Sequence, residues 1–227
     1  MKRVFVLLIG ISSTVTSFSQ LALGIQGTGN LSDASIKNTT LAELDKKARV
    51  LPSAGIVADL TLSSSVTVRS GINFLQQGIT LKSAVPGPAG EIDMIRFSSK
   101  LNLNYLQVPL NVLYTTKGAV QFFAGGGPYF SYAVSGKSKD DITYEFADGS
   151  TETEKQETNV FEKDENGDRT WKRTDFGIGA IAGVKLAGGF FANVGYQFSL
   201  SNLNKADDGK YRNRGLQLTV GYYLWRK

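Results

Sequence analysis

The sequence contains no cysteine and no histidine. Without cysteine, the protein has no disulfide, no thiolate nucleophile and no modified cysteine that could serve as a lipoprotein anchor. Without histidine, the usual zinc ligand sets and His-based acid–base catalysis are excluded as well. We therefore expect a protein that is not an enzyme and that carries no cofactor. The enzymatic alternative that stays open is a carboxylate-only site at Asp59 or Asp175.

Long apolar runs and a strong net charge are also missing. No stretch reaches the ~18 consecutive apolar residues of a transmembrane helix. The formal charge is +5, and it is +3 without Lys2 and Arg3. No basic stripe with interleaved aromatic residues accompanies this mild charge, so nucleic-acid binding is not expected.

The first residues have the pattern of a secretory signal peptide. Lys2 and Arg3 form a basic start, Val4–Ile11 an apolar core, and Ser17-Phe18-Ser19 a small-x-small cleavage site. The alternative is a short membrane anchor, but the apolar core is too short to span a bilayer. We expect residues 1–19 to be the signal peptide and residues 20–227 to form one domain.

What the sequence does have is glycine, 25 of 227 residues, and a strict alternation of side chains. The clearest example is Ala119–Val134, AVQFFAGGGPYFSYAV, in which the even positions are mostly apolar and the odd positions small or amphipathic. Successive side chains of a strand point to opposite faces, so this pattern predicts a strand. Its length suits a tilted membrane strand, which needs about 9–11 residues.

Seven further segments repeat the alternation. The eight predicted strands are 21–26, 53–61, 66–74, 95–115, 119–134, 174–186, 190–200 and 215–224. Their connections alternate strictly between long and short. The short ones lie near Ser63-Ser64, at 116–118 and at 187–189, and the long ones include 27–51 and 136–173.

Two of the long connections contain local signals. Thr40–Arg49 could form one or two helical turns, capped by Thr39 or Thr40 with Glu43 following. Pro86–Gly90 has strong turn chemistry, and Ala147–Ser150 suits a hairpin tip.

An even number of strands with alternating connections predicts an all-β fold, an eight-stranded antiparallel up-and-down transmembrane β-barrel. Such barrels have short periplasmic turns and long extracellular loops. The face opposite the apolar one is dominated by Gly, Asn, Gln, Ser and Tyr, which suits a crowded lumen better than a free surface. The alternative is a soluble secreted barrel or sandwich. We expect Leu60, Val68, Val120, Val184, Val194 and Val220 to face lipid.

The alternation changes phase midway along the predicted strand 95–115. Leu101, Leu103 and Tyr105 are odd, whereas Leu106 and Val108 are even. A β-bulge near Pro109 would produce this change. The alternative is that the upper part of the strand has left the membrane and lies in a different environment.

Two groups of residues are candidate sites. Asp59, Arg69, Asp175 and Lys185 are the few charges on the lumen face, and pairing among them would offset the cost of burying them. Asp164, Asn166 and Asp168 have the alternate oxygen ligands of a calcium loop, but the glycine expected next is Arg169, so a solvated acidic loop is the favoured interpretation. Gly125-Gly126-Gly127 is no phosphate cradle, because the Lys-Ser/Thr of such a loop is missing.

Several motifs resemble the PorT-like outer-membrane β-barrel family of Bacteroidetes-type bacteria. They are Tyr105–Leu110 (YLQVPL), Phe123–Tyr129 (FAGGGPY), Asp175-Phe176-Gly177, Gly195–Leu203 and Gly221–Leu224. The resemblance implies a barrel in the outer membrane of a Gram-negative bacterium, and one member is similar to an accessory factor for secretion. The chain departs from the family at its end, where Leu224 replaces the usual aromatic residue and Trp225 follows. Trp225 would then be what the barrel-assembly machinery recognises.

Aromatic residues near the predicted strand ends fit interfacial girdles. They are Tyr114, Phe130, Tyr132, Phe190, Tyr222 and Trp225. We expect a structural, envelope or protein-interaction role through the extracellular loops, with outer-membrane lipid, the assembly machinery and an envelope or secretion protein as partners. The alternative is a barrel that binds a small ligand or calcium in the upper lumen or in the acidic loop 136–173.

Overall fold

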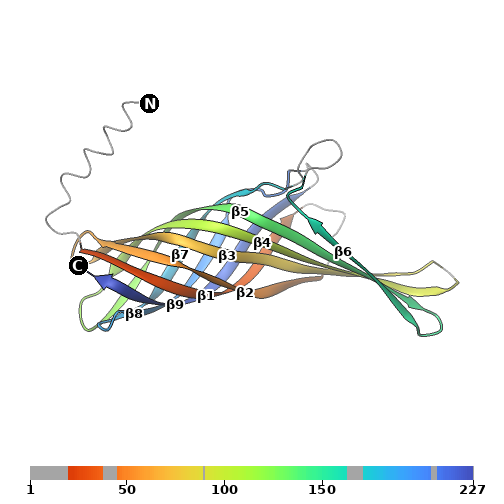
Figure 1. The fold of residues 1–227 in the computed structure, drawn as a ribbon, viewed down its shortest axis with the longest axis horizontal. Coiled ribbons are helices and arrows are strands. Elements are labelled where there is room, and N and C mark those ends of the chain that lie inside the picture. Colours follow the sequence, from red (N-terminus) through yellow and green to blue (C-terminus); the bar gives the residue numbers. More distant parts are fainter. Residues whose placement is uncertain (1–19, 38–44, 89, 163–170, 206–208, 227) are drawn as a thin grey trace, which may run out of the picture.

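The computed structural model describes residues 20–37, 45–88, 90–162, 171–205 and 209–226. They form nine antiparallel strands in one sheet (Figure 1). The strands are β1 (Gln20–Lys37), β2 (Asp45–Thr61), β3 (Val66–Pro86), β4 (Ile92–Thr115), β5 (Val120–Phe146), β6 (Thr151–Asn159), β7 (Thr174–Leu186), β8 (Phe190–Ser199) and β9 (Lys210–Arg226). Within this part of the chain, no helix has the length and apolarity to cross a membrane.

Eight of the strands close into a barrel. The first strand β1 pairs with both β2 and β9, and β4 pairs with β5, so the ring runs β1-β2-β3-β4-β5-β7-β8-β9. Neighbours in the ring are neighbours in the chain, apart from β6. The expectation of an eight-stranded up-and-down barrel is therefore confirmed for the ring, and the ninth strand is an addition to it.

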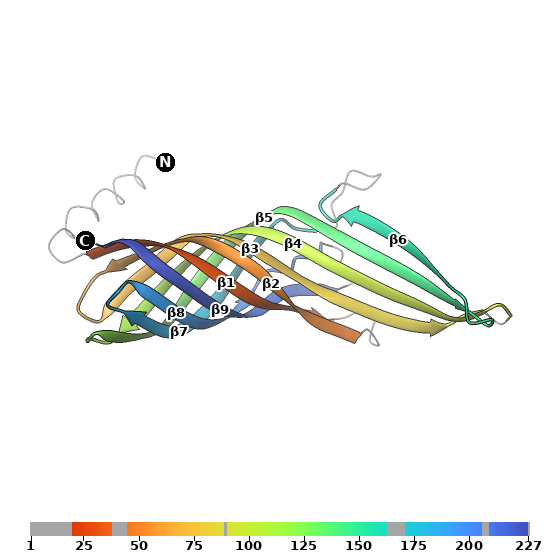
Figure 2. The ribbon, with the colours of Figure 1, turned by 60° about the horizontal axis from the view of Figure 1, so that its bottom comes forward.

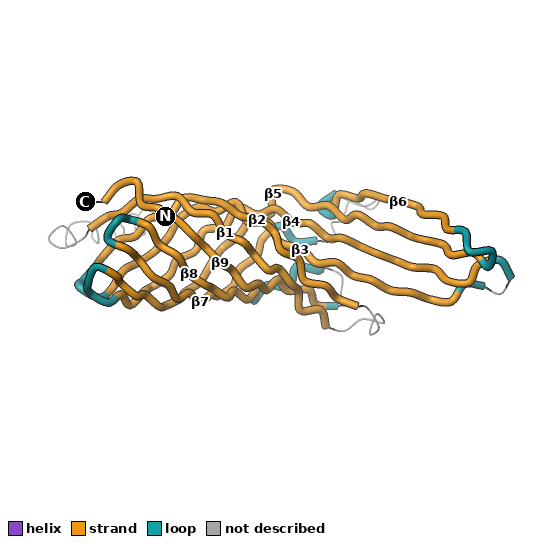
Figure 3. The backbone as a smooth tube through the Cα atoms, turned by 90° about the horizontal axis from the view of Figure 1, so that it is seen from below, coloured by secondary structure: helices purple, strands orange, loops and turns teal. Residues whose placement is uncertain are grey.

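The ninth strand belongs to a sheet that extends beyond the barrel. Up to Tyr132, β5 pairs with β7, and from Lys137 onward it pairs with β6 instead. Together with the long hairpin of β3 and β4, the upper part of β5 and the whole of β6 form an extension that we call the projecting sheet (Figures 2 and 3). The segment 136–173, expected to be a loop, is thus largely strand at its beginning.

Several strands are longer than their alternation predicts. The expected link 27–51 is strand as far as Lys37 and again from Asp45, so the helical turns expected over Thr40–Arg49 are wrong for 45–49. Residues 38–44 lie outside the described residues. The strands continue because polar residues also pair across strands, and such segments carry no apolar alternation to reveal them.

The turns follow the local signals more closely. Strand β3 ends at Pro86, and Gly90 has a φ of 136°. At the other hairpin tip the Phe146 amide donates to the Ser150 carbonyl over 2.9 Å, and Gly149 has a φ of 82°. Glycine adopts such values without the strain that a Cβ brings.

The ring is inside-out compared with a soluble protein. Each of its eight strands directs at least one large apolar side chain outward with half or more of its surface exposed. One such residue per strand is Ile25, Ile56, Ile72, Leu110, Phe122, Ile178, Val194 and Leu218. The lumen contains buried polar side chains, among them Gln107, Asn111, Asn193 and Gln197. The six residues expected to face lipid are all half-buried or exposed.

The phase change in β4 has a different cause from a bulge in that strand. From Leu101 to Thr115 the odd residues of β4 face inward without interruption. The register shift lies opposite Asn104 and Tyr105, where β5 carries an extra residue, Val134. The expectation of a bulge in β4 near Pro109 is therefore wrong. The alternative expectation, that the upper part of the strand lies in a different environment, is correct.

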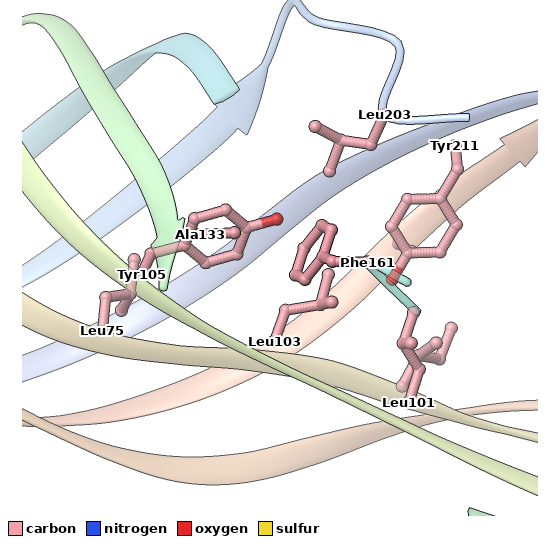
Figure 4. Packing of buried hydrophobic residues seen from close by; sticks show 10 residues of the cluster. Leu75, Leu101, Leu103, Tyr105, Ala133, Phe161, Leu203 and Tyr211 are labelled. Carbon is pink, nitrogen blue, oxygen red and sulfur yellow. The ribbon is translucent and has the colours of Figure 1, made fainter. Parts of the chain in front are cut away.

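The new environment is an apolar cluster inside the barrel at its long-loop end, which we call the plug (Figure 4). Its strand residues include Leu75, Ile79, Leu101, Leu103 and Tyr105, whose inward side chains are 0–7% exposed. Residues from the connections complete it: Phe161 after β6 and Leu203 after β8 are both buried, and Trp171 packs against them. Apolar residues therefore face inward at this level and outward below it.

Candidate functional site

A charged cluster crosses the lumen near the short-turn end. Asp59 of β2 accepts hydrogen bonds from Arg69 Nε at 2.7 Å and Nη2 at 3.0 Å, from Lys185 Nζ at 2.8 Å and from the Tyr223 hydroxyl at 2.5 Å. These four residues come from β2, β3, β7 and β9, so closure of the ring assembles the cluster. We call it the partition.

Aromatic rings hold the central cation of the partition in place. The Arg69 guanidinium carbon lies 4.5 Å from the centroid of the Phe123 ring and 4.9 Å from that of Phe191. The Phe191 ring in turn stacks on Tyr223, with 4.9 Å between centroids. A guanidinium between two ring faces is stabilised electrostatically, and it keeps its planar donors in fixed directions.

Asp175 lies apart from the partition. Its carboxylate accepts hydrogen bonds from the Ser199 hydroxyl at 2.6 Å and from Asn213 Nδ2 at 3.0 Å. Among the described residues no Lys or Arg forms an ion pair with it, so the expected pairing of Asp175 is wrong. The four lumen charges sum to zero. Three of them, Asp59, Arg69 and Lys185, give the partition a net positive charge, and the negative charge of Asp175 lies apart from it.

Glycine makes room for the aromatic rings of the lumen. A Cβ on Gly177 would lie 2.5 Å from Cζ of Tyr129, and one on Gly221 would lie closer still to Cζ of Phe191. Both distances are well inside van der Waals contact, so these positions require glycine for packing.

The partition separates two spaces. Below it, a vestibule of about 690 Å³ opens at the short-turn end and is lined by Asp59, Gln121, Lys185 and Arg226 among others. Above it lies a chamber of about 80 Å³, whose lining includes the amide side chains Gln26, Asn73, Gln107 and Gln197. The plug covers the loop end. The upper lumen, which the sequence suggested as an alternative ligand site, is filled by the plug.

The two faces of the projecting sheet differ in chemistry. On one face, which we call the apolar face, two cross-strand rows run Val85–Ile95–Tyr144–Glu152 and Ser83–Phe97–Ile142–Glu154. Val85 is 42% exposed and Phe97 is 40% exposed. This face is continuous with the lumen side of the barrel, but the described residues place no other element over it.

The opposite face of the projecting sheet carries ion pairs. Arg96 donates to Glu145 over 2.6 Å, and Lys137 and Lys139 both bind Glu157, at 2.5 and 3.0 Å. The hydrogen bond from Arg96 lowers the pKa of Glu145, and those from the two lysines lower the pKa of Glu157. Charged rows of this kind are typical of a solvated sheet face.

Two groups of sequence candidates remain, the acidic segment and the aromatic residues expected in girdles. Asp164, Asn166 and Asp168 lie outside the described residues. Within the described residues, no group of three or more Asp or Glu could hold a metal ion. The six aromatic residues expected in girdles are 37–64% exposed on the outer surface of the strands.

Some functional residues were not singled out from the sequence. Phe123, Phe191 and Tyr223 occupy inward positions of their strands, and Phe161 lies in a connection. For the three strand residues the signal in the sequence is an aromatic side chain on the otherwise small or polar face, whereas Phe161 has no such signal.

These features, an inside-out ring with a polar filled lumen, agree with a comparison against known families. The family model described as "Outer membrane protein beta-barrel domain" matches residues 15–205. The chain belongs to this family. The family places the barrel in the outer membrane of a Gram-negative bacterium. Barrels of this kind have their short turns at the periplasmic end, which puts the projecting sheet outside.

The chain is also similar to several solved structures. Ail, the attachment invasion locus protein of Yersinia pestis, solved with the heparin analogue sucrose octasulfate, is 14% identical, with a TM-score of 0.35 over 90% of this chain and 99% of Ail. Neisserial surface protein A is 16% identical, with a TM-score of 0.33 over 88% of this chain and 96% of its own. OprG from Pseudomonas aeruginosa is 11% identical, with a TM-score of 0.40 over 91% and 95%. No curated protein matches the sequence.

Proposed function

We propose that this outer membrane barrel is an interaction protein, and that the projecting sheet is the part that binds a partner protein outside the cell. The observation that carries the proposal is the difference between the two faces of that sheet. One face is covered by ion pairs, whereas the other exposes Val85, Phe97 and their neighbours in two continuous rows. Exposed apolar patches of this kind mark binding surfaces.

The lumen supports the same conclusion. A transport role needs a continuous path, and here the partition and the plug both interrupt the path through the ring. An eight-stranded ring is only wide enough for its own side chains. The barrel is then an anchor, and the binding chemistry is outside the membrane.

Within the family, we place the chain in the PorT-like group, on the motifs around Tyr105–Leu110 and Phe123–Tyr129. That placement makes an envelope or secretion protein the partner. Residues 1–19 would direct export, and Trp225, which is 45% exposed at the periplasmic end, would be read by the barrel-assembly machinery.

A photo-crosslinking residue at position 97, on the apolar face, tests the proposal in living cells. The matched control carries the same residue at position 153, an exposed threonine of the opposite face. We expect a discrete protein adduct from position 97 and none from position 153. Equal labelling from both positions, or none from either, would contradict a binding role for the apolar face. An adduct with a protein unrelated to the envelope or to secretion would contradict the PorT-like placement alone.

A further inference from the structure

The chamber above the partition has a chemical bias that the interaction role does not use. Among the described residues that line it, Arg69 is the only charged one, and none is Asp or Glu. Asp59, which pairs with Arg69, lines the vestibule on the other side. The chamber therefore contacts Arg69 but not the carboxylate that pairs with it.

The partition as a whole carries a positive excess. One carboxylate, Asp59, is shared by the two cations Arg69 and Lys185. The Lys185 side chain is 16% exposed and lines the vestibule, where water reaches it, whereas the Arg69 side chain is 5% exposed. The other lumen carboxylate, Asp175, does not line the chamber.

Two buried N–H donors of residues that line the chamber have no hydrogen-bond partner among the described residues. They are Arg69 Nη1 and Gln197 Nε2; the hydroxyl of Tyr129, another lining residue, is unpaired as well. Asp59 and Tyr223 occupy the other guanidinium nitrogens, and the flanking rings of Phe123 and Phe191 prevent the group from turning. The amide of Gln197 is oriented by Gln107, whose Nε2 donates to Gln197 Oε1 over 3.1 Å.

Some other polar groups of the chamber are paired with one another. Gln26 donates to Asn73 over 2.7 Å, and the hydroxyls of Thr28 and Thr219 lie 2.8 Å apart. A buried donor without a partner is destabilising, and more so when it belongs to a charged group. A ligand that accepts from both free donors and carries one negative charge would remove this cost.

We propose that the chamber binds a small monovalent inorganic anion, such as chloride, held by Arg69 Nη1 and Gln197 Nε2. The size agrees: about 80 Å³ is room for several water-sized groups, at about 10–15 Å³ of such space each, and so for a halide ion. The anion balances the excess charge of the partition from the chamber side. The proposal is independent of the binding role of the projecting sheet.

Bromide is the probe, because it replaces chloride and scatters X-rays anomalously. The full-length protein is refolded in bromide, so that entry into the closed lumen does not limit binding, and is then crystallised. We expect one anomalous peak in the chamber within hydrogen-bonding distance of Arg69 Nη1. A map with no anomalous peak in the chamber would show that the space holds water only, and would overturn the proposal.

A solution measurement uses variants. The unfolding midpoint should rise with bromide or chloride relative to gluconate, which is too large for the chamber, at equal ionic strength. Gln197→Leu should raise the half-saturating halide concentration about tenfold, and Arg69→Lys should abolish the halide effect if that variant folds. The matched control Gln121→Leu, in the vestibule, should leave the effect unchanged. Equal midpoints in halide and gluconate, or an unaltered halide effect in Gln197→Leu, would contradict the site.

Discussion

At the scale of single residues, the lumen shows how differently two buried carboxylates can be accommodated. Asp59 and Asp175 are each 1% exposed. Asp59 satisfies two cations and a phenol, whereas Asp175 accepts from a hydroxyl and an amide without a cation. Removing the negative charge should therefore destabilise the barrel strongly at Asp59 and only slightly at Asp175.

Asp59→Asn should destabilise the barrel strongly. It leaves Arg69 and Lys185 facing each other without a carboxylate, and breaking a buried ion pair in this way costs about 3–5 kcal/mol. The measurement is the urea midpoint of the protein folded in lipid vesicles, followed by the heat-dependent shift in electrophoretic mobility.

Asp175→Asn is the matched control. Asn213 can turn its amide over to accept from the new side chain, because its Oδ1 has no partner among the described residues. We expect a change of at most about 1 kcal/mol. Equal losses of stability at both positions would show that the ion pairs of the partition stabilise the barrel no more than the neutral hydrogen bonds of Asp175 do.

At the scale of elements, apolar residues mark the inward face of a strand in the upper half of the barrel and the outward face in the lower half. In β4 the residues Leu101, Leu103 and Tyr105 face inward with those that follow, although their apolar character suggests an outward face. The reason is that the plug replaces the polar lumen at this level. The connection that follows β6 therefore contributes Phe161 to the apolar core.

Phe161→Ala should open the plug without unfolding the ring. Removing a buried phenyl ring costs about 3–5 kcal/mol. Here the loss weakens the contact between the residues that follow β6 and the rest of the plug. We expect limited proteolysis within 147–173 to become much faster, while the unheated protein keeps its folded mobility.

Phe130→Ala, on the outer surface of β5 and 49% exposed, provides the control for this change. It should leave the proteolysis rate as it is in the parent protein. If both substitutions accelerate cleavage to the same degree, the plug does not hold the connection in place.

The ion-paired face of the projecting sheet should respond to acid. Hydrogen bonds lower the pKa values of Glu145 and Glu157 below the ordinary 4.5. Their contribution to stability is therefore present above about pH 4.5 and is lost as the pH falls through the lower folded values. We expect the amides of β6 to lose protection from hydrogen exchange between about pH 5 and pH 3, after correction for intrinsic rates.

Glu157→Gln removes one of the titrating groups and should flatten this pH dependence. Protection of β6 that stays constant down to pH 3 in the parent protein would show that the ion pairs do not stabilise the projecting sheet.

At the scale of the whole molecule, lipid is the partner of the outer surface. Val194→Arg places a charge on the outward face of β8, where the side chain is 53% exposed. A charge near the middle of a bilayer costs about 2–4 kcal/mol on the lipid face of a barrel. We expect the urea midpoint in vesicles to fall accordingly.

Gln156→Arg introduces the same side chain on β6 of the projecting sheet, opposite Asp140. There it meets water and a carboxylate, so stability should change by less than about 0.5 kcal/mol. A soluble fold would tolerate Arg at position 194 as well, and equal midpoints for the two variants would refute the membrane assignment of the ring.

The sequence alone determined the ring. Alternation is a local property of a strand, so the residues of 119–134 or 174–186 by themselves show which side chains share the apolar face and which share the small or polar one. The order of short and long connections then settles how many strands close it. The absence of Cys and His determined with equal certainty which chemistries the protein lacks.

Only the tertiary structure decided which residues meet. Asp59, Arg69, Lys185 and Tyr223 lie on four strands, and their contacts depend on the register and on ring closure, which no local pattern encodes. The plug, the chamber and the projecting sheet arise in the same way. Each depends on the level at which a side chain sits in the closed barrel, because the environment on one face of a strand changes from polar to apolar along its length.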